Sequence, residues 1–235
     1  HVYLSTNAEG TLNLLECMRA KGCKKLVLAS TSSLYAGQKM PFTEDLAVNE
    51  PLSPYAASKK AGELMAYSYH KLYQIDVSIV RYFTVFGPAG RPDMSIFRFI
   101  KWIDESLPIE IFGDGYQSRD FTYVDDVVKI ILNLINNPAK KDEKYNTQQP
   151  KADKSWAPYR IYNIGNNNPI KLIDFIKSIE KKLDKKFIIK LKDLQPGDVP
   201  ATYANVDKLK TAFNFKPSTS IEEGVSKFIE WYIEY

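Results

Sequence analysis

Short apolar runs alternate along this sequence with segments of helical periodicity, and this alternation constrains the fold more than any other feature. The run at 26–29 has no polar residue, which is typical of a strand buried on both faces. Strands are predicted at 25–30, 77–81, 109–112, 119–123, 159–164 and 187–191, and helices at 6–21, 54–73, 94–105, 125–134, 172–183 and 220–235. Buried strands that alternate with helices predict an α/β fold with a parallel sheet covered by helices.

Three helix boundaries carry specific signals. Ser53 before a proline is a typical helix start, because serine can cap the first turn and proline fits into it. Gly22 is a helix stop, and Ser220 with Glu223 forms a capping box before the last helix. Residues 138–157 are polar and lack periodicity, so we expect a surface excursion there.

The composition excludes several classes of protein. With 235 residues, of which 44% are hydrophobic and 26% charged, the chain has the composition of a globular protein with a substantial core. The net charge is 32 − 28 = +4 and is spread along the sequence, so nothing points to a nucleic acid or a membrane surface as partner. No apolar run is long enough to span a bilayer.

The cysteines and histidines predict neither disulfides nor a metal site. We expect Cys17 and Cys23 to be buried thiols in a reducing compartment. The only histidines are His1 and His70, and the sequence has no Cys/His spacing typical of metal ligands, so we expect no bound metal.

Tyr55 and Lys59 are the first candidates for catalysis. They are four residues apart in a predicted helix and therefore share one face of it. An ammonium beside a phenol favours the phenolate, which gives a base usable near neutral pH. The same spacing recurs at Tyr67 and Lys71, so the spacing alone also fits a tyrosine beside a solvated lysine.

A run of hydroxyl side chains, Ser30 to Ser33, follows the strand at 25–30. Ligands of open parallel sheets bind beyond the carboxyl ends of the strands, so this run and Tyr55 can face one cleft. A hydroxyl, a phenol and a lysine together suit hydride transfer between a secondary alcohol and a nicotinamide. The alternative interpretation of the hydroxyl run is a polar turn at the end of a strand.

Several blocks of sequence, TNAEGTLNLLE at 6–16, SPYAASK at 53–59 and SRDFTYVDD at 118–126 among them, carry a family resemblance. Further blocks lie at 29–35, 41–45, 51–63, 81–88, 90–94 and 195–203. Together they resemble the extended short-chain dehydrogenase/reductase superfamily over essentially the whole chain. Within it, the chain looks most like the nucleotide-sugar epimerases, and among these the UDP-glucuronate 4-epimerases.

The resemblance implies a role for each matching residue. Tyr55 would be the catalytic base, Lys59 its partner and a ligand of the nicotinamide ribose, and Thr31 the group that bonds the reacting sugar hydroxyl. NAD would be the cofactor, bound by Ser30, Tyr55, Lys59 and Tyr82. The UDP-sugar would be bound by Ser32, Ser33, Thr84, Arg91, Arg119 and Asp198, with Arg119 on the pyrophosphate and Asp198 on the uridine ribose.

The resemblance also implies the architecture: the C-terminal part of a Rossmann-type doubly wound parallel sheet with a smaller α/β substrate-binding lobe. Residues 1–83 would form a partial NAD-binding domain, and 84–235 mainly the lobe, with returning segments that complete the Rossmann sheet. We expect the lobe itself at about 84–125 and 158–205, with the final helix packing back. The helices at 6–21 and 54–73 would lie as a pair and form a homodimer interface.

The chain departs from the family at its start and at Ala36, where a glycine is usual. No G-x-x-G-x-x-G occurs in the 235 residues, so we expect that about three βα elements, roughly 90 residues at about 30 per βαβ unit, precede this part in the family. The chain as given is then expected to bind NAD poorly and to be inactive. We expect a cytoplasmic protein, and a membrane-anchored form stays open.

Three positions favour a uronate 4-epimerase over its sibling enzymes. Ser32 and Ser33 stand where dehydratases and decarboxylases of the superfamily have an acid, and Thr84 where UDP-galactose 4-epimerases usually have asparagine. Arg91 could bind a uronate carboxylate at two points, or it could simply hold Asp93 or a backbone carbonyl. A UDP-glucose/galactose 4-epimerase and a non-catalytic nucleotide-binding relative are the alternatives.

Overall fold

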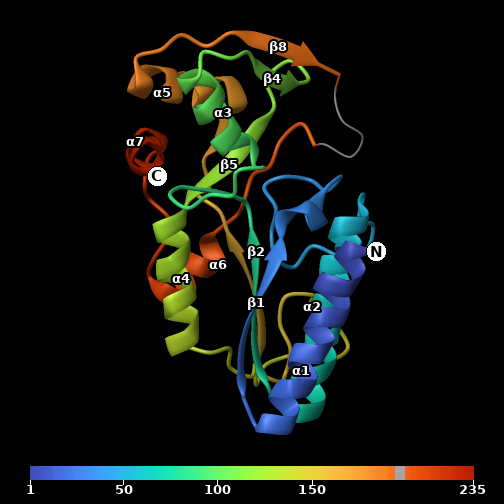
Figure 1. Cartoon of the computed structure of the whole chain (residues 1–235). Coiled ribbons are helices and arrows are strands. Elements are labelled where there is room, and N and C mark those ends of the chain that lie inside the picture. The colour runs from blue at the N-terminus through green and yellow to red at the C-terminus, as the bar shows by residue number, and fades with distance from the viewer. Residues whose placement is uncertain (194–198) are drawn as a thin grey trace. The chain divides into compact units, whose positions relative to one another are not determined.

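The computed structural model describes residues 1–193 and 199–235, and the chain divides into two compact units (Figure 1). Unit 1 consists of His1–Tyr82, Lys129–Ile164 and Asn205–Phe215, and unit 2 of Phe83–Val128, Gly165–Ala204 and Lys216–Tyr235. The chain passes from one unit to the other several times, so neither unit is a continuous stretch of sequence.

The sheet of unit 1 has three parallel strands, which confirms the sheet type predicted from the sequence. β1 (Lys25–Thr31), β2 (Asp76–Tyr82) and β6 (Tyr159–Ile164) lie in the order β1-β2-β6. Residues 77–81 of the central strand are all buried, as in a strand covered on both faces. β6 pairs with β2 and is almost wholly buried too. Residues 159–164 therefore belong to this sheet and not to the lobe in which we expected residues 158–205.

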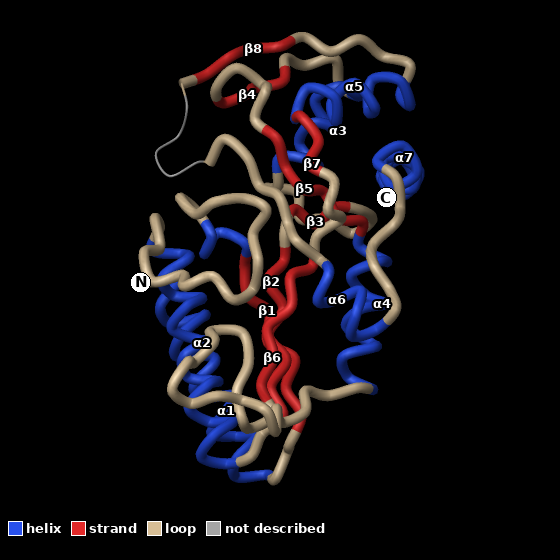
Figure 2. Tube along the Cα trace, turned by 180° about the vertical axis from the view of Figure 1, so that it is seen from behind, coloured by secondary structure: helices blue, strands red, loops and turns tan. Residues whose placement is uncertain are grey.

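Two long helices lie side by side next to this sheet (Figures 1 and 2). α1 (Gly10–Lys21) continues a π-helical stretch, η1 (Leu4–Glu9), and pairs with α2 (Pro54–Tyr73), which packs on β1 and β2. The expected helix pair is therefore confirmed. The short helices η2 (Ser32–Tyr35) and α6 (Asp207–Phe213) also belong to unit 1. The core between helices and sheet contains Leu15, Met18, Leu26, Ala66, Ile75, Val77, Ile79, Tyr159 and Ile161.

The predicted helix boundaries are confirmed at three positions. The Ser53 hydroxyl accepts a hydrogen bond from the Ala56 N–H at 3.1 Å and caps α2. Gly22 ends α1 in the left-handed region, at φ 69°, which glycine adopts at little cost. The Ser220 hydroxyl caps the last helix by accepting from the Glu223 N–H at 3.1 Å.

The expectation that both cysteines are buried is wrong, because Cys17 and Cys23 are exposed. Leu15 and Met18 form the buried face of α1. At 3.6 residues per turn, Cys17 lies away from both of them and points to solvent. Cys23 follows the glycine that ends α1 and lies outside the helix.

Unit 2 contains two small sheets. In one, β3 (Thr84–Phe86) is parallel to β5 (Ser118–Tyr123), and β5 is antiparallel to β7 (Pro169–Lys171). In the other, β4 (Ile109–Phe112) and β8 (Ile189–Lys192) are parallel. Unit 2 is thus an α/β unit with sheets of its own.

Four helices complete the fold: α3 (Ser95–Asp104), α4 (Val124–Asn136), α5 (Leu172–Leu183) and α7 (Ile221–Glu234). α4 runs from unit 2 into unit 1, and the other three pack around the aromatic core of unit 2. In that core the rings of Phe121 and Phe175 stack with their centroids 4.4 Å apart. Among the helices of residues 1–193 and 199–235, none has both the length and the apolar character of a membrane span.

Candidate active site

The face of α2 that carries Tyr55 and Lys59 lies at the carboxyl end of β1. The Lys59 ammonium donates to the backbone carbonyl of Ala29 at 3.1 Å, two residues before β1 ends at Thr31. Tyr55 lies one helical turn before Lys59 and shares its face of the helix. Both side chains are half-buried, and burial lowers the pKa of the Lys59 ammonium from its ordinary value.

The hydroxyl run at the end of β1 forms a tight polar turn. The Thr31 hydroxyl accepts from the Ser33 N–H and donates to the Ser33 hydroxyl, both at 3.1 Å, and so caps η2. Ser32 is half-buried and Ser33 is exposed. A threonine hydroxyl has one proton and two lone pairs, so Thr31 uses its proton and one lone pair in this turn.

Tyr82 and Ser30 are both neighbours of Thr31, one in the adjacent strand and one in the same strand, and their environments differ. Tyr82 ends β2 and pairs in register with Thr31. The Tyr82 side chain is half-buried, and burial raises its pKa to about 12, so the phenol stays protonated at neutral pH. Ser30 is buried, and its hydroxyl donates to the Glu63 carboxylate at 2.6 Å. The Ser30 side chain is therefore engaged inside unit 1.

A buried network of polar side chains lies behind this end of the sheet, and sequence reasoning missed it. Arg81 of β2 binds Glu63 of α2 at two points, with Nε–Oε1 at 2.9 Å and Nη2–Oε2 at 2.8 Å. Arg81 Nη1 also donates to the Tyr35 hydroxyl at 2.8 Å, which donates to Asn163 Oδ1 at 2.7 Å. Together with Ser30, these side chains are all buried.

The charges of this network are held in place by their partners. Burial acts to raise the pKa of Glu63, but the bonds from Arg81 and Ser30 outweigh it, so the carboxyl has a pKa below its ordinary value. Burial raises the pKa of Tyr35, which keeps that phenol neutral. A signal for the pair was present in the sequence: a charged residue inside an apolar strand, and an acid four residues after Lys59.

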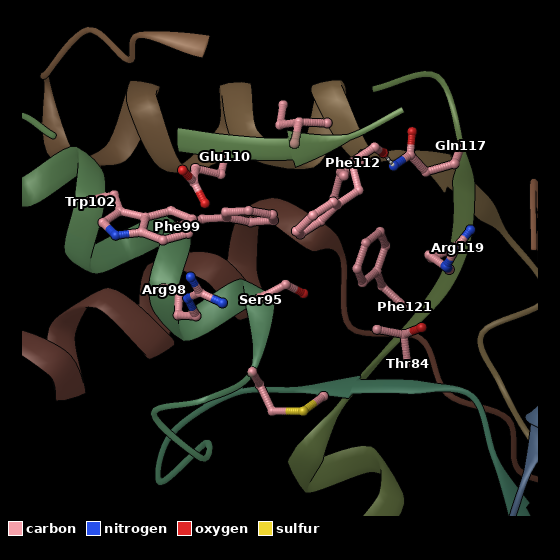
Figure 3. A pocket seen from close by; sticks show the side chains of 13 residues that line it. Thr84, Ser95, Arg98, Phe99, Trp102, Glu110, Phe112, Gln117, Arg119 and Phe121 are labelled. Carbon is pink, nitrogen blue, oxygen red and sulfur yellow. Dashed lines mark hydrogen bonds between the residues drawn. The ribbon is translucent and has the colours of Figure 1, made fainter. Parts of the chain in front are cut away.

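Unit 2 contains a pocket of about 330 Å³, lined by α3 and by strands β4 and β5 (Figure 3). Its polar and aromatic lining includes Thr84, Ser95, Arg98, Phe112, Gln117 and Arg119. Two guanidinium groups beside aromatic rings suit a ligand that combines a flat ring with negative charge, such as a nucleotide. The structure thus places two of the predicted substrate residues, Thr84 and Arg119, in one pocket.

One aromatic ring and two backbone carbonyls orient polar groups of this pocket. The Arg98 guanidinium lies over the ring of Trp102, 4.4 Å from its centroid. Gln117 donates to the backbone carbonyl of Phe112 at 2.6 Å (dashed line in Figure 3). Arg119 donates to the backbone carbonyl of Ser118 at 2.9 Å. Sequence reasoning missed Arg98, although it stands one turn into a helix that follows the conspicuous 90–94 block.

Asp120, the residue after Arg119, is a buried anchor for two loops of unit 2. Its carboxylate accepts from the N–H groups of Asn166 at 2.6 Å, Asn167 at 3.1 Å and Ala204 at 3.0 Å. Burial raises the pKa of Asp120, and these three bonds oppose that rise. An ideal Cβ on Gly165 would lie 2.4 Å from the Ala204 Cβ, so only glycine allows this approach.

Arg91, the remaining predicted substrate residue of unit 2 that the structure describes, does not line this pocket. Arg91 is exposed and forms a two-point ion pair with Asp93, both bonds at 3.1 Å, which is the second of the two interpretations that the sequence allowed. Asp198 lies outside the described residues. Within residues 1–193 and 199–235, no three His, Cys, Asp or Glu side chains are grouped to hold a metal ion.

A parallel sheet with a tyrosine–lysine helix at the carboxyl end of its edge strand defines the class: a Rossmann-type α/β protein of the short-chain dehydrogenase/reductase kind. The model of the NAD dependent epimerase/dehydratase family matches residues 1–165. The chain therefore belongs to the NAD dependent epimerase/dehydratase family.

Several known proteins are similar to this chain over nearly its whole length. Protein CapI of Staphylococcus aureus is 47% identical over 99% of this chain and 70% of its own length. UDP-glucuronate 4-epimerase of Thermodesulfobacterium geofontis is 50% identical over 98% of this chain and 66% of its own length. The structure of UDP-glucuronic acid 4-epimerase from Bacillus cereus, in complex with UDP-glucuronic acid and NAD, matches with a TM-score of 0.85 at 32% identity, covering 98% of this chain and 68% of that one. The chain thus spans about two thirds of the length of these relatives.

Proposed function

We propose that this chain carries the catalytic and substrate-binding residues of an isomerase, a nucleotide-sugar 4-epimerase that inverts C4 of UDP-glucuronate and UDP-galacturonate through a transient 4-keto sugar. The observation that carries the proposal is the 3.1 Å bond from Lys59 to the Ala29 carbonyl, which holds the Tyr55 face of α2 at the strand end. The family match and the UDP-glucuronate 4-epimerases among the relatives support the same activity.

The residues present fit one end of the NAD that the family uses. Tyr55, Lys59 and Tyr82 supply phenol and ammonium donors around the carboxyl ends of β1 and β2, which suits a nicotinamide and its ribose. The glycine-rich turn that binds the pyrophosphate of such cofactors is not in these 235 residues. NAD bound at this end would supply reversible hydride transfer at C4 of the sugar.

The side chains of unit 1 would move and hold the proton of this reaction. Tyr55, as phenolate, takes the proton of the C4 hydroxyl and later gives it back. The Lys59 ammonium favours the phenolate by its charge. Thr31 would redirect the proton that it now donates to Ser33 toward the same sugar oxygen and so fix the direction of that oxygen. Tyr82 stays protonated at neutral pH, since burial raises its pKa to about 12, and so adds no competing base.

Unit 2 would bind the UDP. Arg119, with Arg98 as a second guanidinium, would pair with the pyrophosphate, and Phe112 would pack on the uracil ring. Asp198 would accept from hydroxyls of the uridine ribose. The sugar end would be bound by Thr84, and by Ser32 and Ser33 from the turn after β1.

Arg91 is the residue proposed to bind the carboxylate of the uronate. A carboxylate at C5 distinguishes UDP-glucuronate from UDP-glucose, and an unpaired carboxylate is costly to desolvate. Arg91 can offer it the same two-point contact that it now makes with Asp93. Because that pair is exposed, its exchange for a substrate carboxylate costs little.

We also propose a homodimer through α1 and α2. The two helices are paired, and they expose apolar side chains, among them Leu12, Leu64 and Leu72. Two copies packed through this surface would bury those side chains in a four-helix arrangement.

Two alternatives make different predictions in one assay. The protein, expressed with its natural N-terminus, is incubated separately with UDP-glucuronate and UDP-glucose, and the 4-epimers are separated chromatographically. Our proposal predicts conversion of UDP-glucuronate with a clear preference over UDP-glucose. A preference for UDP-glucose would favour a neutral-sugar epimerase, and the absence of any conversion a non-catalytic nucleotide-binding relative.

A further inference from the structure

The buried network of unit 1 begins one residue from Thr31, one helical turn from Lys59 and two turns from Tyr55. Ser30 precedes Thr31 in β1, and its hydroxyl donates to Glu63 at 2.6 Å. Glu63 follows Lys59 by four residues and lies one turn further along the same face of α2. The network therefore touches both elements that carry the proposed base, its partner and the hydroxyl turn.

The second strand and the turn are tied into the same network. Arg81 precedes Tyr82, whose register partner in the neighbouring strand is Thr31. Through Nη1, Arg81 also holds the hydroxyl of Tyr35, the last residue of η2. β1 and η2 are thus each joined to the Glu63–Arg81 pair by a hydrogen bond, of 2.6 and 2.8 Å, and the pair itself joins α2 to β2.

Stability alone does not account for a pair of charges at this position. The side chains of Arg81 and Glu63 are 0% and 1% exposed. Buried ion pairs lose so much hydration that apolar residues of similar volume often stabilise a protein as well or better. A two-point guanidinium–carboxylate contact does have a property that apolar packing lacks, since it fixes both a distance and an orientation between two elements.

We propose that the Glu63–Arg81 pair positions the catalytic helix, setting the depth and rotation of α2 on the sheet so that Lys59 stays at the Ala29 carbonyl and Tyr55 at the end of β1. Glu63 and Arg81 are positioning residues, because they act through Lys59 and Tyr55. Where the inference concerns the reaction, it rests on the function proposed above.

The decisive variant replaces the whole pair, Glu63→Leu with Arg81→Met, so that neither member is left as a buried, unpaired charge. Lys60, whose ammonium lies 3.7 Å from the Glu63 carboxylate and is 18% exposed, loses that contact in the same variant. A matched control is the Lys208–Asp153 ion pair of unit 1, at 2.6 Å and also largely buried, replaced by Asp153→Leu with Lys208→Met. That pair joins α6 to the 138–157 segment, and neither of these carries a proposed catalytic group. Ser30→Ala is a milder third variant, because it leaves the ion pair intact.

The first readout is turnover of UDP-glucuronate by the protein with its natural N-terminus. We expect kcat to fall by about 10-fold or more in the Glu63→Leu/Arg81→Met variant, because small displacements of catalytic groups are costly. KM stays within about twofold, since the groups proposed to bind UDP are in unit 2. Ser30→Ala lowers kcat by about threefold, and the control leaves it within about twofold. Unchanged kcat in both Glu63→Leu/Arg81→Met and Ser30→Ala would overturn the proposal.

The second readout does not depend on activity. With ¹³C-labelled lysine, the Lys59 resonance is assigned by its loss in Lys59→Arg and titrated in each variant of the chain. We expect the pKa of Lys59 to lie below its ordinary value in the parent and the control and to rise toward it in Glu63→Leu/Arg81→Met, as the ammonium leaves its half-buried contact. An unchanged Lys59 titration would overturn positioning even in an active enzyme. If the Lys59 titration changes in Glu63→Leu/Arg81→Met while the parent protein has no epimerase activity, the positioning role stands and the proposed function is refuted.

Discussion

Both units bury acidic side chains, but Glu63, beside the proposed catalytic groups of unit 1, is satisfied in a different way from Asp120 and Asp126 of unit 2. In unit 1, Glu63 is paired with the guanidinium of Arg81 across two secondary-structure elements. In unit 2, Asp126 accepts from the backbone N–H groups of Ser218 and Thr219 at 3.1 and 3.0 Å, and Asp120 likewise binds backbone N–H groups. A side-chain pair fixes helix against strand, whereas a carboxylate on backbone N–H groups fixes loops.

This difference matches the work that each unit is proposed to do. Proton transfer needs groups held within hydrogen-bond reach of one substrate atom, so rigid links between α2, β1 and β2 serve the chemistry. Nucleotide binding needs cationic side chains beside the phosphates of the ligand. In unit 2 the anchors are backbone-bound carboxylates, and Arg98 and Arg119 line the pocket.

The largest expected effect separates chemistry from binding. Tyr55→Phe removes the proton acceptor and keeps the ring, so kcat should fall by about 10²- to 10⁴-fold. The affinity for UDP, measured by calorimetry, should not change, because the pocket with Arg119 is in the other unit. Equal turnover in Tyr55→Phe and the parent would refute Tyr55 as the base. A large loss of UDP affinity in this variant would contradict the assignment of the chemistry to unit 1 and of UDP binding to unit 2.

The next prediction concerns the pH dependence of stability. Both histidines of the sequence, His1 and His70, are in unit 1, so histidine protonation is expected to act on that unit. His70 is fully buried with its Nε2 2.9 Å from the Ser155 hydroxyl, and burial lowers its pKa from 6.5 to about 4. The unfolded chain therefore binds this proton at a higher pH than the folded one. Stability is complete above pH 6.5 and falls as the pH decreases toward 4, by about 3 kcal/mol for this group.

The matched variant for this pH prediction is His70→Gln, which keeps a hydrogen-bonding side chain without the titration. Urea unfolding at pH 7, 6, 5 and 4 gives the free energy of unfolding of both proteins. The parent should lose about 3 kcal/mol more than the variant between pH 7 and 4. Parallel curves for the two proteins would show that His70 does not contribute to the acid response.

A smaller effect is expected in unit 2, on substrate choice. Arg91→Ala removes the proposed carboxylate contact, so the preference for UDP-glucuronate over UDP-glucose should fall by about 10- to 100-fold, the equivalent of a charge-assisted hydrogen bond. The ratio of kcat/KM for the two sugars is the measurement. Asp93→Asn is the control, because it frees Arg91 from its ion pair and should keep the preference. An unchanged ratio in Arg91→Ala would leave Arg91 as a loop arginine that holds Asp93.

The smallest effect compares the two units directly through their helix caps. Ser53 caps α2 in unit 1 and Ser220 caps α7 in unit 2. In each cap the serine hydroxyl oxygen lies 3.1 Å from the backbone nitrogen that donates to it. Ser53→Ala and Ser220→Ala should each lower the free energy of unfolding by about 1 kcal/mol. Only Ser53→Ala should also lower kcat, because it loosens the first turn of α2, where Tyr55 lies. An equal effect of both variants on kcat would contradict the assignment of chemistry to unit 1.

The elements with strong local signals were predictable from the sequence. The helix at Pro54–Tyr73 has the predicted bounds because the Ser53 cap and the apolar periodicity agree there, and the helix at Leu172–Leu183 has them because of its apolar periodicity. The three-residue strands β3 and β7 and the seven-residue helix α6 were missed. Segments this short contain too few residues to show a period of 2 or 3.6.

The site was predictable only where a motif is local. Tyr55 and Lys59 are one turn apart, so their shared face follows from helix geometry alone. The Glu63–Arg81 pair joins residues 18 apart on different elements, and the bond from Tyr35 to Asn163 joins residues 128 apart. Such pairs depend on strand order and packing, which neither residue reveals by itself. The exposure of Cys17 likewise depended on which face of α1 meets the core.

The most direct test of the account is interconversion of the two UDP-uronates by the protein with its natural N-terminus and NAD. Separate reactions start from UDP-glucuronate and from UDP-galacturonate and are followed by anion-exchange chromatography. The account predicts that both reactions reach the same mixture of the two epimers, and that Tyr55→Phe prevents this in both directions. No interconversion by the parent protein, or interconversion that survives in Tyr55→Phe, would contradict it.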